Sequence, residues 1–487
     1  MDAETKVKVI SGLKWTSFET FAKQALQFVI SIFIARKLMP SDYGVVGMLS
    51  IFMAISATFI DSGFSSALIQ KKDATERDLS TAFLFNVIVA SFFYIILFIS
   101  APWIADFYNQ PLLVPITRIY TFNLVISAVC GIQGTVLTRA LKFNVSSKLS
   151  IISVLVSGVL GIVMAYAGFG VWALVWPGIG TGIINIILLW RATRWWPKLI
   201  FSKTSFHALF GFGSKHLASS IINSIYSNVS TLVIGKFFQA KDLGLFTRAQ
   251  SLAILPADVT RSVVVRVNYP VLSKLQDDDE KLLAAYSSIL RGPMFLLYPV
   301  LAGIAALSYP LIDVLLGEKW LACHLMVTIL AIGAMWKPLS SINLNLLYVK
   351  GRTDLVLKLE LMKKPFAFAM LFAAIPFGII GMCVSVAMYD FVAFLFNCHY
   401  TGKLLGYGFG RQIKELLPII GYSTVMAGAV ILSVSLISSS VLKLAIGIPL
   451  GIVVYFALAI LFSDRTVKTI GAYIAPKFPK IGWLQKL

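Results

Sequence analysis

Charged side chains lie inside several long apolar stretches of this sequence. The first stretch is KWTSFETFAKQALQFVIS at 14–31, where Glu19 and Lys23 stand among aliphatic and aromatic residues. On a helical wheel at about 100° per residue they share one face with Gln27 and further hydroxyl and amide side chains, over an arc of about 160°. The opposite face is apolar. This division predicts that one side of the helix faces water; the alternative is that Glu19 and Lys23 pair with each other on a packed helix.

A second stretch, SKHLASSIINSIYSNVSTLVIG at 214–235, shows the same division into a polar and an apolar face. Lys215, Asn223 and Tyr226 lie on its polar side. Polar surface at membrane depth is tolerated where it lines a water-filled cavity. We therefore expect both helices to border a hydrated cavity between two lobes.

Cations predominate among the other charges inside apolar stretches. Lys337 lies in MWKPLSS, Lys363 and Lys364 lie in LELMKKPFAF, and Arg248 lies in the outer part of its stretch. One charge at the bilayer centre costs from about 3 to more than 10 kcal/mol, depending on the method of measurement. Clustered lysine and arginine side chains in a cavity are typical of a site for phosphate or an acidic sugar. For each residue alone, snorkelling or a structural ion pair is the alternative.

Acidic residues are fewer inside these stretches. Asp390 in SVAMYDFVAF either pairs with a lysine of another helix, Lys337 or Lys363, or binds a coupling ion, H⁺ or Na⁺. Asp61 in FIDSGFSSALIQKK has Arg261 exactly 200 residues later, which suggests a gate pair across two halves of the chain.

The elements that carry these residues are membrane-spanning helices. The chain has 487 residues, of which 58% are hydrophobic and 13% charged, and its mean hydropathy is +0.84. Apolar runs of about 20 residues are long enough to cross a bilayer as helices. We expect an all-α polytopic membrane protein with about fourteen spans. These are 14–36, 43–67, 79–101, 112–138, 147–167, 170–191, 207–235, 242–267, 285–314, 321–348, 355–376, 379–401, 414–437 and 441–462.

The net charge of +20 follows the predicted membrane and does not indicate nucleic acid. Basic residues such as Lys71, Arg139 and Lys198 gather in alternate connections, while the connection at 102–111 has none. This asymmetry predicts that both termini are cytoplasmic, and no secretory signal is evident at the start. The four cysteines and four histidines show no metal-binding spacing, so we expect neither a metal site nor a cofactor.

The chain also contains an internal repeat. ARKLMPSDYGVV at 35–46 aligns with GKFFQAKDLGLF at 235–246, which places Asp42 over Asp242 and Gly44 over Gly244. Two halves of six spans each should be related by an axis along the membrane normal. The expected domains are an N-lobe at 1–203, a C-lobe at 204–405, and two further spans with a basic cytoplasmic tail at 406–487.

Four segments carry a resemblance to a known family: ISGLKW at 10–15, ARKLMPSDYGVV at 35–46, FIDSGFSSALIQKKD at 59–73 and APWIADFYNQPLL at 101–113. They resemble the polysaccharide transporter family, relatives of the Wzx-type flippases in the multidrug/oligosaccharidyl-lipid/polysaccharide (MOP) superfamily. The branch with exporters of colanic and teichuronic acid is the most similar.

The resemblance implies a flippase of the bacterial inner membrane. Its cargo would be an undecaprenyl-diphosphate-linked oligosaccharide for a surface polysaccharide such as capsule, exopolysaccharide or O-antigen, carried by alternating access. Its partners would be the lipid bilayer, a polysaccharide polymerase and a chain-length regulator. Cavity residues vary within the family, so no single lysine here is assigned as a ligand by the resemblance.

Three other functions stay open. A multidrug exporter of the same superfamily is disfavoured because a cationic lining repels cationic drugs. An exporter of lipid-linked peptidoglycan precursors has the same charge requirements. A membrane polymerase or glycosyltransferase is disfavoured because the outer connections are short and no acid/base cluster is present in the sequence.

Overall fold

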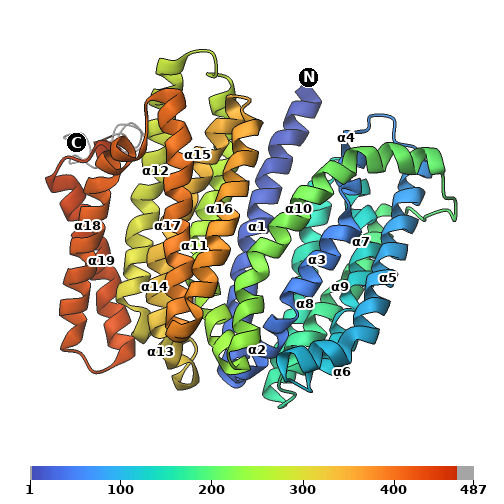
Figure 1. The fold of residues 1–487 in the computed structure, drawn as a ribbon, viewed down its shortest axis with the longest axis horizontal. Coiled ribbons are helices and arrows are strands. Elements are labelled where there is room, and N and C mark those ends of the chain that lie inside the picture. Colours follow the sequence, from blue (N-terminus) through green and yellow to red (C-terminus); the bar gives the residue numbers. More distant parts are fainter. Residues whose placement is uncertain (1–2, 469–487) are drawn as a thin grey trace. The chain divides into compact units, whose positions relative to one another are not determined.

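The computed structural model describes the backbone of residues 3–468. Within this part it describes all side chains except those of residues 3–14, 16–18, 20, 21, 212, 213, 215, 216, 218, 219, 265–267 and 270. All regular secondary structure in the described part is helical, as Figure 1 shows. Contacts between helices divide the chain into two compact units, Met1–Gly244 (unit 1) and Leu245–Leu487 (unit 2).

Unit 1 consists of ten helices and the start of an eleventh. They are α1 (Ala3–Lys37), α2 (Pro40–Met48), α3 (Ser50–Asp61), α4 (Phe64–Gln70), α5 (Glu76–Tyr108), α6 (Leu113–Tyr120), α7 (Asn123–Arg139), α8 (Phe143–Tyr166), α9 (Trp172–Thr193), α10 (Lys203–Phe237) and the first residues of α11 (Ala240–Ser273).

Unit 2 contains the rest of α11 and the helices that follow it. They are α12 (Asp279–Ala306), α13 (Ser308–Leu315), η1 (Glu318–Cys323), α14 (His324–Ala334), α15 (Lys337–Val349), α16 (Thr353–Ala373), η2 (Ile375–Phe377), α17 (Gly378–Leu405), α18 (Phe409–Ser435) and α19 (Ser440–Leu461).

Ten described segments are long and apolar enough to cross a membrane. The other four expected spans correspond to α1, α10, α11 and α16, which are also long helices. These four carry most of the charged and polar residues that the sequence singled out, which lowers their hydropathy. The protein is therefore an all-α, multi-pass membrane protein, and the number of fourteen spans stays a prediction.

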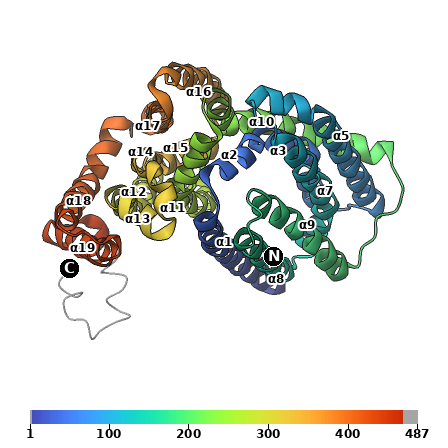
Figure 2. The ribbon, with the colours of Figure 1, turned by 90° about the horizontal axis from the view of Figure 1, so that it is seen from below.

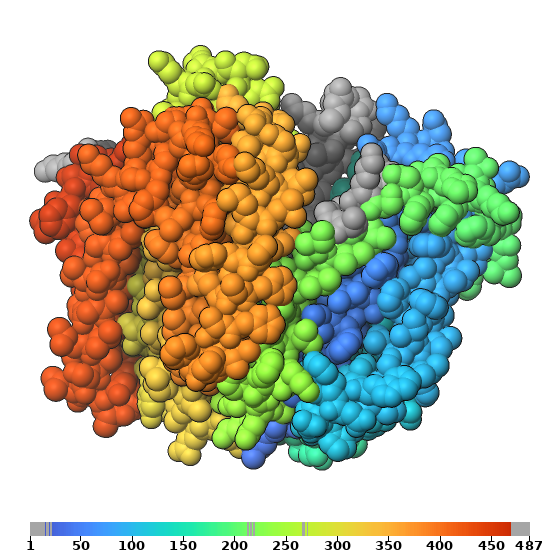
Figure 3. All heavy atoms as spheres, viewed as in Figure 1, coloured from blue at the N-terminus to red at the C-terminus, as the bar shows by residue number. Residues whose placement is uncertain are grey.

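The outer side of α5 shows which solvent the helices face. Large apolar side chains at a spacing of three or four residues are exposed along it, from Ile88 at 60% to Trp103 at 67%. Figure 3 shows this face of the molecule, with α5 in blue at the right. An exposed apolar stripe of this length on one helix face suits the hydrocarbon of a bilayer.

The buried faces pack helix against helix within each unit. In unit 1, α1 lies along α8 and α8 along α9 (Figure 2), and the buried side chains of Ile34, Ala165 and Ala173 join these three helices. In unit 2, α12 packs against α18, and the hydroxyl of Tyr455 on α19 donates to the carbonyl of Phe295 on α12 at 2.6 Å.

The repeated D-x-G motif has a structural explanation. Asp42 accepts a hydrogen bond from the backbone nitrogen of Met39 at 2.9 Å, and Asp242 accepts one from that of Gln239 at 3.3 Å. Each aspartate therefore satisfies a backbone N–H where its helix begins, α2 or α11. The contact-based division places α10 in unit 1, whereas the repeat predicts a boundary at 203/204, and that repeat-based division stays a prediction.

Candidate functional site

The polar face of α1 contacts α8. Ser147 of α8 donates a hydrogen bond to the Oε2 of Glu19 at 2.7 Å, and Lys23 donates from Nζ to the hydroxyl of Ser150 at 2.9 Å. Both charged side chains are half-buried, while Gln27 is exposed. Part of the polar face of α1 therefore packs against α8. The two serines that it contacts there were not predicted from the sequence. Each serine lies more than 120 residues from its partner, so no local spacing signals the contact.

The polar face of α10 is also partly occupied by a packing contact. The hydroxyls of Ser224 on α10 and Thr58 on α3 lie 2.6 Å apart. Asn223 is exposed and Tyr226 half-buried. The side chain of Lys215 lies outside the described residues.

The lysine pair of α16 shares an acidic neighbour. Lys363 is only 5% exposed and donates to Glu360 at 2.7 Å, while the Nζ of Lys364 lies 3.5 Å from the other carboxylate oxygen of Glu360. Glu360 was not predicted from the sequence. It precedes Lys363 by three residues and Lys364 by four, a spacing at which side chains of one helix meet, and this spacing could have revealed it. Two positive charges and one negative charge are therefore held together at membrane depth.

A second charged cluster joins three helices of unit 2. The Nζ of Lys337 on α15 lies 3.9 Å from the Oδ2 of Asp390 on α17. Asp258 on α11 interacts electrostatically with Asp390 and forms an ion pair of 3.4 Å with Arg261. Asp258 was not among the residues that the sequence predicted. Arg248, on the same helix, is buried at 6% exposure.

The expected gate pair falls into different units. Asp61 belongs to unit 1, at the end of α3, and Arg261 belongs to unit 2, where its described ion pair is with Asp258. A contact between Asp61 and Arg261 therefore stays a prediction.

Asp61 borders a cavity of about 390 Å³ in unit 1. The lining comes from α3, α4, α5 and α7 and includes Ser65, Asn86, Asn123 and Ser127 in addition to Asp61. Beside Asp61 the second expected span is broken, because Ser62 and Gly63 both have positive φ angles, 43° and 71°. Asp61 was expected within one continuous span at 43–67, and this break was not predicted.

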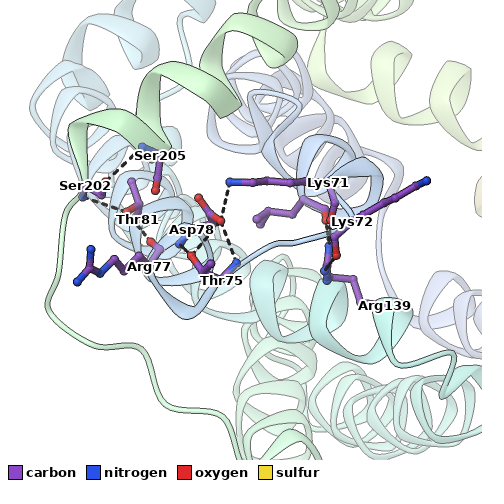
Figure 4. A network of polar contacts seen from close by, with 10 residues as sticks. Lys71, Lys72, Thr75, Arg77, Asp78, Thr81, Arg139, Ser202 and Ser205 are labelled. Carbon is purple, nitrogen blue, oxygen red and sulfur yellow. Dashed lines mark hydrogen bonds and ion pairs between the residues drawn. The ribbon is translucent and has the colours of Figure 1, made fainter.

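A polar network at one end of unit 1 holds the helices around this cavity in place (Figure 4). The carboxylate of Asp78, which is 1% exposed, accepts hydrogen bonds from the Nζ of Lys71 at 2.7 Å and from the backbone and hydroxyl of Thr75. Ser205 of α10 also bonds to Asp78. The guanidinium of Arg139, at the end of α7, donates to the backbone carbonyls around Lys71. Lys71 and Arg139, which belong to two different predicted cytoplasmic connections, therefore have a structural role.

Unit 2 carries an apolar groove, which we define by its lining from α12, α13, α18 and α19. Its volume is about 330 Å³. The lining includes Leu296, Val300, Leu311, Ile448 and Ile452, and all its side chains are aliphatic, aromatic or thioether groups. Such a surface accommodates hydrocarbon chains and offers little to a sugar.

Comparison with known proteins agrees with the transporter architecture. The family described as "Polysaccharide biosynthesis protein" matches residues 33–325. The chain is 28% identical to the teichuronic acid biosynthesis protein TuaB of Bacillus subtilis over 94% of this chain and 96% of that protein. It is 25% identical to the lipopolysaccharide biosynthesis protein WzxC of Escherichia coli over 73% of each chain.

Solved structures show the fold. The lipid II flippase MurJ in an inward closed conformation has a TM-score of 0.76 at 16% identity, covering 92% of this chain and 98% of its own. An inward-facing multidrug resistance MATE transporter of the MOP superfamily has a TM-score of 0.61 at 14% identity, covering 79% of this chain and 94% of its own. Because the polysaccharide biosynthesis protein family matches more than half of its length, the chain belongs to that family, and its fold is similar to the folds of MurJ and of the MATE transporter.

Proposed function

We propose that this protein moves an undecaprenyl-diphosphate-linked oligosaccharide from the cytoplasmic to the outer leaflet of the bacterial inner membrane. The product would feed the synthesis of a surface polysaccharide. Both termini would lie in the cytoplasm, as the distribution of basic residues predicts. The observation that carries the proposal is the match to TuaB over nearly the whole length of both chains.

Two features of the described residues support this cargo. Lysines at membrane depth, such as Lys23 and Lys363, offer donors and positive charge to a diphosphate or a uronic acid. The apolar groove offers a surface for part of the polyprenyl tail. Cationic side chains and a hydrocarbon surface suit a lipid-linked anion better than a cationic drug.

The transport mechanism would be alternating access. A cargo drives exchange between inward-open and outward-open states only if it binds the two states with different affinity. The polar faces of α1 and α10 would supply this difference by holding the diphosphate and sugar hydroxyls in one state more tightly. H⁺ or Na⁺ could supply further energy through Asp390.

The test is a flipping assay in proteoliposomes with a fluorescent undecaprenyl-diphosphate oligosaccharide. We expect the purified protein to move the lipid between leaflets without forming new glycosidic bonds. A variant with Lys23→Gln, Lys215→Gln and Lys363→Gln should lose transport at unchanged abundance. Lys281→Gln, at a lysine that is 73% exposed, is the control. Normal transport by the triple variant would refute the site, and new glycosidic bonds would refute a transporter.

Lipid II in the same liposomes separates the proposed cargo from a peptidoglycan precursor. A fold shared with both MurJ and a MATE transporter does not select among their substrates. We expect faster transport of the oligosaccharide than of lipid II. The reverse order would assign the protein to the peptidoglycan pathway.

A further inference from the structure

The cavity beside Asp61 has a lining suited to a small cation. Of the described residues that border it, Asp61 is the only charged one, and its polar neighbours are amide and hydroxyl side chains. Carboxylate, amide and hydroxyl oxygens are the ligands that hard cations prefer in proteins. A volume of about 390 Å³ holds an ion together with several waters, since one water takes about 30 Å³ of liquid volume.

The backbone around Asp61 adds negative potential to this cavity. Asp61 is the last residue of α3, and the C-terminus of a helix carries partial negative charge from carbonyls that lack intrahelical partners. A carboxylate is disfavoured at this end of a helix unless a cation or proton offsets it. Breaks in a membrane span place backbone carbonyls beside bound ions in this manner.

The backbone turns sharply beside the cavity, between α3 and α4. Ser62 adopts φ 43°, a left-handed conformation that is uncommon for a residue with a side chain, and Gly63 follows at φ 71°. Interrupted backbone at membrane depth is tolerated where it is buried or lines a wet cavity. Strained residues of this kind cluster at ligand sites.

Asn86 provides an independent observation. It lines the cavity from α5, it is 3% exposed, and its Oδ1 has no hydrogen-bond partner among the described residues. Leaving a buried amide oxygen unpaired costs about 1–3 kcal/mol. A ligand or its hydration water in the cavity would remove that cost.

From these four features we propose that the cavity binds a monovalent cation, with Asp61, which is exposed at its edge, as the charged ligand and the buried Asn86 as a neutral one. The repeat offset of 200 places Arg261 at the equivalent position of the second half, so the site would be confined to unit 1. It is separate from Asp390, which lies in unit 2. The proposal does not depend on the identity of the transported glycan.

The experiment measures equilibrium binding of ²²Na⁺ to the full-length protein in detergent, without any lipid-linked sugar, with choline chloride keeping the ionic strength constant. We expect saturable binding that Asp61→Asn weakens at least tenfold and Asn86→Ala weakens severalfold. Asp106→Asn, at an exposed aspartate near the other end of α5, should leave Na⁺ binding unchanged.

Asp61→Glu is the control for a loss of Na⁺ binding that is caused by misfolding of Asp61→Asn. It retains the charge on a longer side chain and should bind Na⁺ more weakly than the wild type but more strongly than Asp61→Asn. Unchanged binding in Asp61→Asn would overturn the proposal, and so would the absence of saturable Na⁺ binding by the wild type. Because no glycan is present, neither result depends on whether the protein is a flippase.

Discussion

Gly44 and Gly244 form a reciprocal backbone contact. A Cβ on Gly44 would overlap the backbone carbonyl of Ala240, and a Cβ on Gly244 would overlap that of Pro40 and lie 3.0 Å from the nitrogen of Gly44. The two copies of the D-x-G motif therefore cross each other where α2 and α11 begin.

The first prediction concerns this crossing. Gly44→Ala and Gly244→Ala should each lower the abundance of folded protein and abolish transport, because the added methyl group meets backbone that cannot move aside cheaply. Thermal unfolding in detergent, followed by intrinsic fluorescence, measures the effect. Gly134→Ala on α7 is the control, since a Cβ there has no atom within 4 Å, and its stability should be unchanged or higher. Wild-type stability of Gly44→Ala would contradict the contact.

The second prediction concerns the polar network of Figure 4. Asp78→Ala should lower the free energy of unfolding by about 1–3 kcal/mol, because the backbone amide and the hydroxyl of Thr75, at the start of α5, both lose their acceptor and Lys71 loses its partner. Glu76→Ala, two residues away in an ion pair exposed at 55% and 61%, should change it by less than about 0.5 kcal/mol. Chemical denaturation in detergent measures both. Equal effects would show that burial of Asp78 is unimportant.

The third prediction concerns charge on α16. Lys363→Gln should reduce transport of the diphosphate-linked cargo at least tenfold, whereas Lys358→Gln, at an exposed position of the same helix, should leave it unchanged. The Glu360→Gln variant should bind cargo more tightly, because the substitution removes the negative charge that Lys363 and Lys364 share. Initial rates and cargo affinity in proteoliposomes distinguish these outcomes. A loss of transport in Lys358→Gln equal to that in Lys363→Gln would indicate a general charge effect.

The fourth prediction concerns the apolar groove. Ile452→Trp should fill it and slow transport of cargo with a full-length polyprenyl tail. Val453→Trp is matched in helix, size and hydrophobicity, but Val453 does not line the groove and should tolerate the change. Cargo with a shortened tail should be affected less by Ile452→Trp. Equal rates for the two tryptophan variants would exclude the groove as a tail site.

Hydropathy predicted the helical spans well because a bilayer requires every backbone polar group to be paired within the segment. It could not predict where a span breaks. The sequence DSGFSS around Ser62 contains a glycine, but a glycine alone does not distinguish a break from a close helix contact, as Gly44 shows.

Partners of the charged residues were predicted less well, for a physical reason. Helical periodicity assigns a side chain to a face, whereas the partner on the facing helix depends on tertiary packing. The contact between Lys23 and Ser150 spans 127 residues. The buried ion pair between Arg291 of α12 and Asp464, after α19, is another contact that no local spacing reveals. Glu360 was missed as well, although its partners lie three and four residues away on its own helix, where local spacing does reveal them.

The last prediction tests the role of Asp390. At 3.9 Å, the Lys337–Asp390 contact is an ion pair without a direct hydrogen bond, and Asp390 is 13% exposed. If the pair is structural, Asp390→Asn and Lys337→Gln should each destabilise the protein, because each leaves a buried charge without its partner, and the double variant should regain most of the loss. If Asp390 binds a coupling ion, the double variant should regain stability but lose the dependence of transport on Na⁺ or on pH. We expect the second result, because a separation of 3.9 Å leaves Asp390 without a direct hydrogen bond from Lys337. Stability and ion dependence are measured on the same four proteins, and a double variant that transports with unaltered ion dependence would reduce Asp390 to a structural residue.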